Sequence, residues 1–351
     1  MTSKLKFLVA TSTLAAAIMN ASSAHAAGAL VGTDITNQVS VAYQVGGVNQ
    51  TAATDTETFL VDRKIIFTTV EAATTGTTTV VPGQQDAVTR FQVSNTSNDT
   101  LDFSLLATQL ANGATAAHGG TDAFDVANLQ VFVDNVSGGG TVGVYDPGID
   151  TATSIDNLAP DDSRYVFVIG DVALTQTNGQ VAGVSLAATA LNSNGSAITA
   201  ATDGTANTAG VETIFADTSR DGVETAGDDY TVSAAALTVT KLSRVVSDGV
   251  SASNPKAIPG AVVEYCIVVS NAAGAATATN VAVSDDLALV PDVTFLGSFT
   301  PATDGTVVSG STCTPGSGTG SFNGGTNIVS GTLANIAAGE TRTLVFRVTI
   351  D

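Results

Sequence analysis

Short runs in which apolar and polar residues alternate recur along the chain, separated by Gly, Asn, Asp and Pro. Val, Ile, Thr, Phe and Tyr dominate these runs, and a period of two is typical of strands that bury one face. No stretch after the first 26 residues keeps the 3.6-residue period of an amphipathic helix, although the Ala-rich run 186–191 suits a helical turn or a strand. Many short strands joined by turn residues predict an all-β protein made of β-sandwiches. The clearest runs are 39–45, 88–93, 129–133, 165–169, 237–240, 262–269 and 344–350.

The pattern occurs twice in the same order. Each copy has a Pro-Gly turn, a strand ending in Ser-Asn, a polar loop, a second strand and, further on, a short polar turn before another strand. Such a repeat predicts two units of one design, a first domain at 63–236 with an insertion at roughly 111–156, and a second domain at 237–351. The matching segments are 81–95 with 258–271, and 158–162 with 336–340.

The first 26 residues have the pattern of a secretory signal peptide. Lys4 and Lys6 precede a short apolar stretch, and Ala24-His25-Ala26 is a small-residue cleavage site. The alternative is a first core helix. No later stretch of about 20 apolar residues is present, so we expect no transmembrane segment. These features predict a protein that is secreted or held at the cell surface.

Charge and composition narrow the function classes. The chain has 12 Lys and Arg against 32 Asp and Glu, a formal net charge of −20. A field of that sign repels phosphate backbones and anionic lipids, so we expect no nucleic-acid partner. The chain has no Trp, two His, two Cys and two Met, and no Ser-His-Asp or Cys-His arrangement is supported. We therefore expect no enzyme, and a solvated loop position for His118.

The two cysteines, Cys266 and Cys313, form the only possible pair. In an exported protein they are expected to form a disulfide, and closing a 47-residue separation stabilises by about 4 kcal/mol in the chain-entropy model. The alternative is two free structural thiols.

One acidic segment has the spacing of a calcium-binding loop. Side-chain oxygens stand at positions 1, 3 and 5, a Gly at position 6, a backbone carbonyl at position 7 and a carboxylate at position 12, as in an EF-hand loop. A possible Ca²⁺ site therefore includes Asp217, Ser219, Asp221, Val223 and Asp228. The alternative is an Asp-Gly turn at the end of a strand. A weaker candidate of irregular spacing is the loop with Asp134, Asp146, Asp150 and Asp156.

The segment 27–62 precedes the first predicted domain and contains a further strand. Alternation places Val39, Val41, Tyr43 and Val45 on one apolar face. The strand either belongs to the chain's own first sandwich or is donated to the sheet edge of a neighbour.

The second unit resembles a known family of repeats. The segment from Lys241 to the predicted strand at 344–350 is similar to the repeat called domain of unknown function eleven, and the similarity covers about residues 237–351. The first unit fits less well, because Phe91 replaces a Tyr and Asp161-Asp162 replaces Gly-Glu. The resemblance implies immunoglobulin-like sandwiches in a protein of the bacterial or archaeal surface, and it implies no shared activity. The matching residues are Lys241, Pro259, Gly260, Tyr265, Ile267, Val269, Asn271, Asp286, Leu287, Leu333, Gly339 and Glu340.

Together these features predict two tandem immunoglobulin-like β-sandwiches preceded by an extended strand segment. The predicted function is an exported structural protein of the cell surface, an extracellular filament or a biofilm matrix, with partners that are further copies of itself or other surface proteins. The alternative is an adhesin or binding module for a glycan or a protein, although the absence of Trp and the 5% aromatic content disfavour glycan binding.

Overall fold

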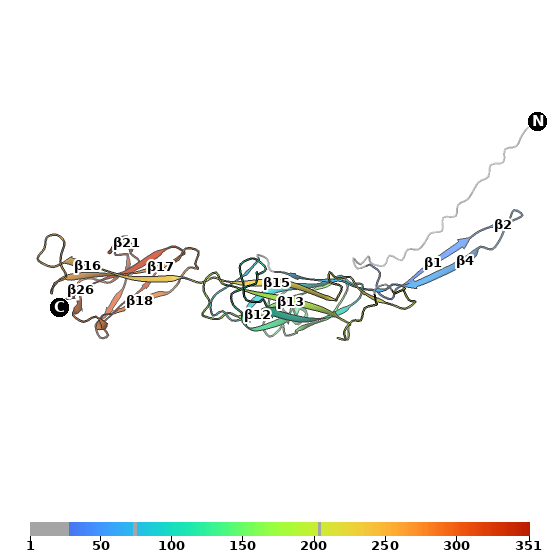
Figure 1. The fold of residues 1–351 in the computed structure, drawn as a ribbon, viewed down its shortest axis with the longest axis horizontal. Coiled ribbons are helices and arrows are strands. Elements are labelled where there is room, and N and C mark those ends of the chain that lie inside the picture. Colours follow the sequence, from blue (N-terminus) through green and yellow to red (C-terminus); the bar gives the residue numbers. More distant parts are fainter. Residues whose placement is uncertain (1–27, 73–75, 203–204) are drawn as a thin grey trace, which may run out of the picture.

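The computed structural model describes residues 28–72, 76–202 and 205–351 and shows an all-β protein. Two β-sandwiches follow one another along an elongated molecule, and a separate hairpin projects from the N-terminal end (Figure 1). The predicted signal peptide lies outside the described residues. Within them, no helix is long and apolar enough to cross a membrane.

The first sandwich packs a four-stranded sheet against a five-stranded sheet. The Ala-rich run at 186–191 is strand and not helix, since it lies within the five-stranded sheet. The predicted insertion contributes a strand to the four-stranded sheet, so part of it belongs to the sandwich itself. In order, the first sheet is β10 (Ala127–Val133), β12 (Ser163–Asp171), β8 (Ala87–Asn95) and β6 (Phe67–Glu71). The second is β11 (Ser154–Leu158), β9 (Leu101–Gln109), β13 (Val181–Leu191), β15 (Val223–Val232) and β7 (Thr78–Val80). A short parallel pair, β5 (Arg63–Ile65) with β14 (Thr213–Phe215), lies beside them.

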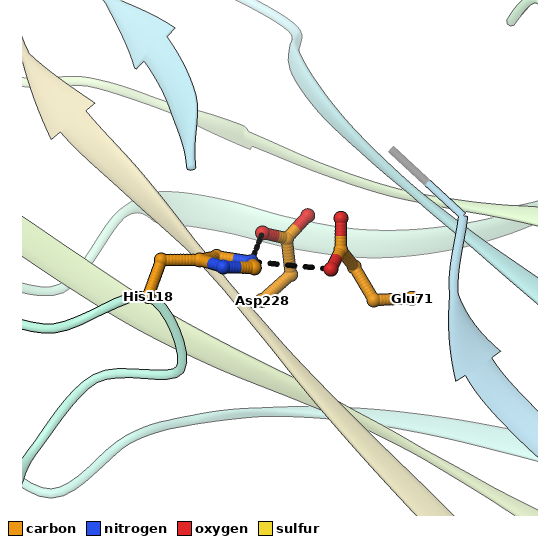
Figure 2. Close-up of side chains that lie close together, drawn as sticks. All are labelled: Glu71, His118 and Asp228. Atoms are coloured by element: carbon orange, nitrogen blue, oxygen red, sulfur yellow. Dashed lines mark ion pairs between the residues drawn. The ribbon is translucent and has the colours of Figure 1, made fainter. Parts of the chain in front are cut away.

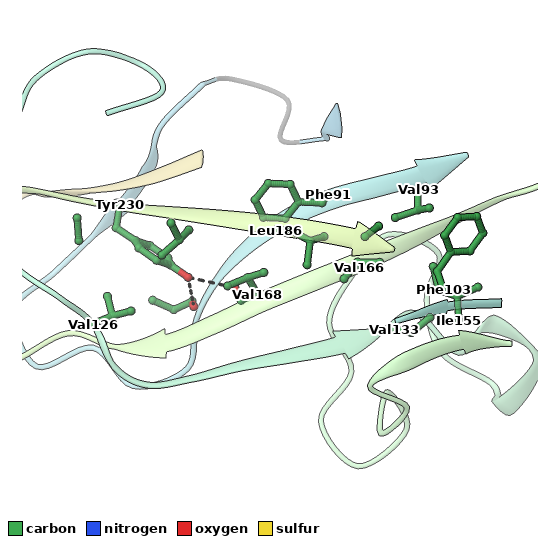
Figure 3. Packing of buried hydrophobic residues seen from close by; sticks show 14 of the residues in the cluster. Phe91, Val93, Phe103, Val126, Val133, Ile155, Val166, Val168, Leu186 and Tyr230 are labelled. Atoms are coloured by element: carbon green, nitrogen blue, oxygen red, sulfur yellow. Dashed lines mark hydrogen bonds between the residues drawn. The ribbon is translucent and has the colours of Figure 1, made fainter. Parts of the chain in front are cut away.

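A buried tyrosine links the two sheets of the first sandwich across its core. Alternate residues of the facing sheets fill the space between them, among them Phe91, Phe103 and Leu186 (Figure 3). Tyr230 on β15 is fully buried, and its hydroxyl lies 3.1 Å from the carbonyl oxygen of Ala87 and 3.0 Å from that of Val168. Both carbonyls belong to the opposite sheet, so this side chain joins the two sheets through a polar contact inside the core.

The second sandwich has sheets of unequal width, six strands against three. β16 begins at Leu237, after a linker of four residues, 233–236, that follows β15. The larger sheet has β16 (Leu237–Ser247), β17 (Val262–Asn271), β26 (Thr341–Ile350), β20 (Ala302–Thr303) and β23 (Gly318–Thr319), with β19 (Val293–Phe295) also paired to β26. The smaller has β18 (Val281–Asp286), β25 (Ile328–Leu333) and β24 (Ser321–Asn323).

A buried asparagine ends the same strand in both sandwiches. Asn95 closes β8, and its amide donates to the carbonyls of Asp99 and Leu158, each at 2.8 Å. Asn271 closes β17, and its amide donates to the carbonyls of Ala276 and Ile336 at 2.8 and 2.9 Å. The two units are therefore alike in their internal hydrogen bonds as well as in their sequence pattern.

The following turn is also the same in both units. The backbone N–H of Asp161 donates to the Asn95 carbonyl, and that of Gly339 donates to the Asn271 carbonyl. Asp161 has φ +65° and Gly339 has φ +75°, the left-handed region that favours Gly and that Asp tolerates. This explains how Asp161-Asp162 stands where the second unit has Gly-Glu.

The predicted disulfide joins Cys266 and Cys313, and both cysteines are buried. Cys266 lies on the side of β17 that faces away from the main core, where it packs with Val268 and Val345. Cys313 lies on β22 (Thr312–Thr314), which pairs with β21 (Thr306–Ser309). The bond therefore holds a small hairpin against the outer face of the six-stranded sheet.

Replacing Tyr230 with Phe should lower the free energy of unfolding by about 1–2 kcal/mol, because two buried carbonyls lose a hydroxyl donor while the ring still fills the core. Urea denaturation of the first sandwich would measure the change. Tyr43→Phe is the matched control, since that ring is exposed and its loss of a hydroxyl should leave stability within about 0.5 kcal/mol. Equal effects of the two substitutions would contradict this role for Tyr230.

Breaking the disulfide should destabilise the second sandwich by about 4 kcal/mol, since the unfolded chain then regains the freedom of a 47-residue loop. Denaturation of the same protein with and without reductant measures this loss without any substitution. Intact-mass analysis after alkylation without reductant should find no free thiol. Two alkylated cysteines in the purified native protein would show that the bond does not form.

Candidate functional site

The N-terminal segment forms a hairpin that belongs to neither sandwich. β1 (Asp34–Val41) pairs with β4 (Ala53–Leu60), and the short strands β2 (Gln44–Val45) and β3 (Val48–Asn49) continue toward the tip of the hairpin. Figure 1 shows this hairpin projecting beyond the first sandwich. The expectation that the strand belongs to the chain's own sandwich is therefore wrong, because no sandwich strand pairs with it among the described residues.

All four residues of the predicted apolar face are exposed. Val39 and Val41 are each 56% exposed, Tyr43 51% and Val45 61%. Cross-strand pairing adds Phe59, which lies opposite Ile35 on the same face of the hairpin. The register also places Asn37, Asp55 and Glu57 on this face, while Thr, Ser and Gln side chains dominate the other one. The apolar residues of β1 therefore alternate with polar ones and are exposed to solvent.

Several hydrogen bonds fix the base of the hairpin to the first sandwich, and the side chain of Asn98 makes three of them. Asn98 is buried, and its amide donates to the carbonyls of Ala29 and Asp62 at 3.2 and 2.8 Å. Its side-chain oxygen accepts the backbone N–H of Lys64 at 2.8 Å. The hairpin therefore leaves the body at a defined position.

The second sandwich contains an apolar groove between its two sheets. It is lined by residues of β16, β17 and β18 and has a volume of about 470 Å³. Leu237 and Val239 lie on the same face of the larger sheet as the buried Val269, yet they are 41% and 66% exposed. Lys241 on β16 forms an ion pair with Asp285 on β18 and bridges the two walls at one end of the groove.

The groove exists because the smaller sheet does not reach across the larger one. β18 is an edge strand that pairs only with β25 in the part of the chain that the structure describes. One further strand on the free edge of β18 would lie over Leu237 and Val239. The second sandwich therefore has both an unpaired strand edge and an uncovered apolar surface beside it.

The twelve-residue calcium loop is not formed as the spacing predicts. Asp217 to Gly222 form a turn, in which the Asp217 carboxylate accepts the backbone N–H groups of Asp221 and Gly222, both at 3.2 Å. Val223 begins β15, and Asp228 lies five residues further along this extended strand, about 17 Å from Val223 at the usual rise. Asp228 therefore cannot share one ion with Asp217, Ser219 and Asp221, which lie in a turn at the start of the strand.

In the second acidic loop, the carboxylates accept hydrogen bonds from backbone N–H groups of the same loop. Asp134 accepts the N–H of Gly143 at 2.7 Å, and Asp150 accepts the N–H groups of Asn135 and Asp146 at 2.8 and 2.7 Å. These bonds use both carboxylate oxygens of the buried Asp150 and one oxygen of the buried Asp134.

Asp228 lies close to His118 and Glu71, two residues that the EF-hand spacing did not associate with it. The imidazole Nε2 of His118 lies 3.3 Å from Asp228 Oδ1 and 3.2 Å from Glu71 Oε2 (Figure 2). Asp228 is 1% exposed, and the pKa of its carboxyl is raised to about 7. Burial is the main cause, and the negative charge of Glu71 acts in the same direction, whereas the hydrogen bond from the backbone N–H of Asp229 and the imidazole of His118 lower this pKa. His118 lies in an exposed loop, as predicted, but its imidazole is 26% exposed and lies beside two carboxylates that the sequence did not associate with it.

No family model matches this chain, and no curated protein matches it in sequence. Among solved structures, it is similar to the C-terminal domain of the antigen I/II polypeptide BspA of Streptococcus agalactiae, with a TM-score of 0.32 and 10% identity over 82% of this chain and 91% of that one. It is also similar to the C-terminal domain of the antigen I/II-family protein AspA of Streptococcus pyogenes, with a TM-score of 0.33 and 9% identity over the same shares, 82% and 91%. The description of this chain as tandem β-sandwiches rests on its own strand pairing.

Proposed function

We propose that this chain is an exported structural protein of the cell surface or extracellular matrix, whose copies join head to tail by β-strand addition. The observation that carries the proposal is a pair of incomplete surfaces in one molecule. One is the exposed hairpin at residues 34–60, and the other is the free edge of β18 with the groove beside it.

The isolated hairpin would gain stability from pairing with a further strand. A two-stranded hairpin alone in water is marginally stable, and three or more strands with a covered face are needed for independent stability. Every residue of β1 is exposed, and the outer edges of both long strands are unpaired among the described residues. Added pairing would satisfy the free backbone groups and cover Val39 and Val41.

The groove fits an extended strand of this kind. β18 has six residues and β1 has eight, so at about 3.4 Å per residue β1 covers about 27 Å and spans the whole edge. Backbone hydrogen bonds to β18 would supply affinity, and alternate side chains would enter the groove over Leu237 and Val239.

The two surfaces lie too far apart to meet within one chain. The first sandwich stands between the hairpin and the second sandwich (Figure 1). Because Asn98 fixes the base of the hairpin on the first sandwich, folding back would require that anchor to break. The contact is therefore between copies, and a head-to-tail contact between different surfaces propagates unless it closes into a ring.

The charge distribution favours this direction of assembly. The hairpin segment 28–62 has four acidic and no basic residues. Residues 63–236 have five basic and twenty acidic residues, whereas residues 237–351 have five basic and eight acidic ones. An acidic hairpin is thus repelled far less by the second sandwich of a neighbour than by the first.

Export is supported by two features of the chain. The first 26 residues have the pattern of a signal peptide, and the buried Cys266–Cys313 bond is stable in an oxidising compartment. A strand from another surface protein is the alternative occupant of the groove, which would make the chain a binding module or adhesin component.

Replacing both Val39 and Val41 with Asp should abolish self-assembly of the exported form that begins at Ala27, because two carboxylates of β1 in place of apolar side chains cannot enter the groove. Light scattering coupled to size exclusion and negative-stain microscopy would measure the loss. Ser40→Asp, on the opposite face of the same strand, is the control and should assemble normally.

Val239→Asp should block the acceptor surface in the same way, with Thr238→Asp on the other face of β16 as its control. A mixture of the hairpin variant and the groove variant should then give dimers and nothing longer, since one retains only an acceptor and the other only a donor. Wild-type protein that stays monomeric at high concentration would overturn homopolymer formation and favour a different partner for the groove.

A further inference from the structure

The residues Glu71, His118 and Asp228 come together from three separate elements of the first sandwich. Glu71 ends β6, His118 lies in the loop between β9 and β10, and Asp228 lies on β15. One possible ligand atom from each lies within 4.8 Å of the other two. β6 belongs to the four-stranded sheet and β15 to the five-stranded sheet, so the cluster joins both layers of the sandwich.

The cluster has unused buried oxygens. Glu71 Oε1 and Asp228 Oδ2 are both buried and have no hydrogen-bond partner among the residues that the structure describes. The Asp228 side chain is fully covered, and an unpaired buried carboxylate oxygen is costly. Figure 2 shows the two carboxylates next to one another on the same side of the imidazole ring. The arrangement therefore lacks a positive partner that can serve both carboxylates.

The distances suit a shared ion better than a pair of hydrogen bonds. The imidazole Nε2 carries at most one hydrogen, yet it lies 3.2 Å from one carboxylate oxygen and 3.3 Å from the other. Charge-assisted N–H to carboxylate bonds are usually about 2.7–2.9 Å long. In a tetrahedral site with metal-ligand bonds of about 2.0–2.1 Å, neighbouring ligand atoms are about 3.3 Å apart.

We propose that Glu71, His118 and Asp228 bind a divalent transition-metal ion, with Zn²⁺ as the test case. One imidazole nitrogen and two carboxylate oxygens are ligands that such ions accept. Ca²⁺ takes oxygen ligands and does not take the imidazole, so the site discriminates against the ion that the acidic spacing suggested.

Neighbouring groups hold the ligands in position. The backbone N–H of His118 donates to Asp229 Oδ2 at 2.8 Å, and the backbone N–H of Asp229 donates to Asp228 Oδ1 at 2.7 Å. The His118 and Glu71 side chains are 26% and 21% exposed, which leaves one side of the cluster open to solvent. An ion can therefore enter from that side and keep a water molecule as its fourth ligand.

The bound ion would link the two sheets of the most acidic part of the chain. It would neutralise two carboxylates in a domain with twenty acidic and five basic residues. The ligands come from β6, β15 and a loop, so the ion adds a direct link between β6 and the other two elements, which the bond from His118 N–H to Asp229 already joins. The site has a structural role, and the assembly of copies proposed above does not depend on it.

The chain offers a specific probe of this site, because His25 and His118 are its only histidines. A protein that begins at Ala27 gives the signals of one imidazole in long-range ¹H–¹⁵N spectra. One equivalent of Zn²⁺ should shift the Nε2 signal of His118 and raise the melting temperature, with a stoichiometry of one by calorimetry. One equivalent of Ca²⁺ should leave the His118 signals unchanged.

Asp228→Asn and Glu71→Gln preserve side-chain shape and should each weaken Zn²⁺ binding at least about tenfold, the lower end of the loss that even an outer partner causes. Asp125→Asn, an exposed carboxylate of the same domain, is the control and should bind as the wild type does. Wild-type His118 signals that do not respond to Zn²⁺ would overturn the proposal, whether or not the variants fold. Zn²⁺ binding without a His118 shift would place the ion elsewhere and overturn it as well.

Discussion

Both sandwiches depend on a buried asparagine at the end of a central strand. The amides of Asn95 and Asn271 each donate to two carbonyls at the end of the sandwich, three of them in loops and one, that of Leu158, at the end of β11. A loop crossing the end of a sandwich buries backbone groups that no ladder satisfies, and each one left without a partner costs about 1–3 kcal/mol. One amide with two donors and an acceptor meets this need in the smallest space. Asn271 also accepts the N–H of Ala236, so the same side chain positions the junction between the sandwiches.

The two sandwiches differ in how completely one sheet covers the other. The first packs four strands on five and adds a tyrosine whose hydroxyl reaches the opposite sheet. The second packs three strands on six, and the surplus face at the start of β16 stays open. The disulfide covers the outer face of that larger sheet and leaves the inner opening untouched. An opening in an otherwise well-covered domain, together with an unsupported hairpin elsewhere in the chain, gives the proposed assembly its physical basis.

Much of the fold could be predicted from local pattern. Alternation at 262–269 and 344–350 located two central strands of the second sandwich, and the Pro-Gly repeat indicated two related units. Pattern could not tell whether residues 39–45 lie in a sandwich, because an alternating strand has the same sequence whether its apolar face is covered at home or by a neighbour. The isolated cysteines indicated their own pairing, since no competing partner exists.

The side-chain cluster was beyond such reasoning for a different reason. Glu71, His118 and Asp228 are far apart in sequence, and only strand register and loop path bring them together. The EF-hand spacing assigned Asp228 to the wrong neighbours, because it counts residues without asking whether the chain turns or extends between them. The available signal was the run from Val223 to Val232, where a strand assignment would have placed Asp228 away from the turn at Asp217.

The direction of the strands has a mechanical consequence. The strands of both sandwiches run roughly along the long axis of the molecule, and the hairpin projects from one of its ends (Figure 1). In a row of copies under tension, a strand paired along β18 would be pulled parallel to its own length. Its hydrogen bonds would then bear the load together, in shear, rather than open one after another as in a peeled hairpin. The same geometry protects the groove itself, because its walls are continuous strands that the pull stretches without separating.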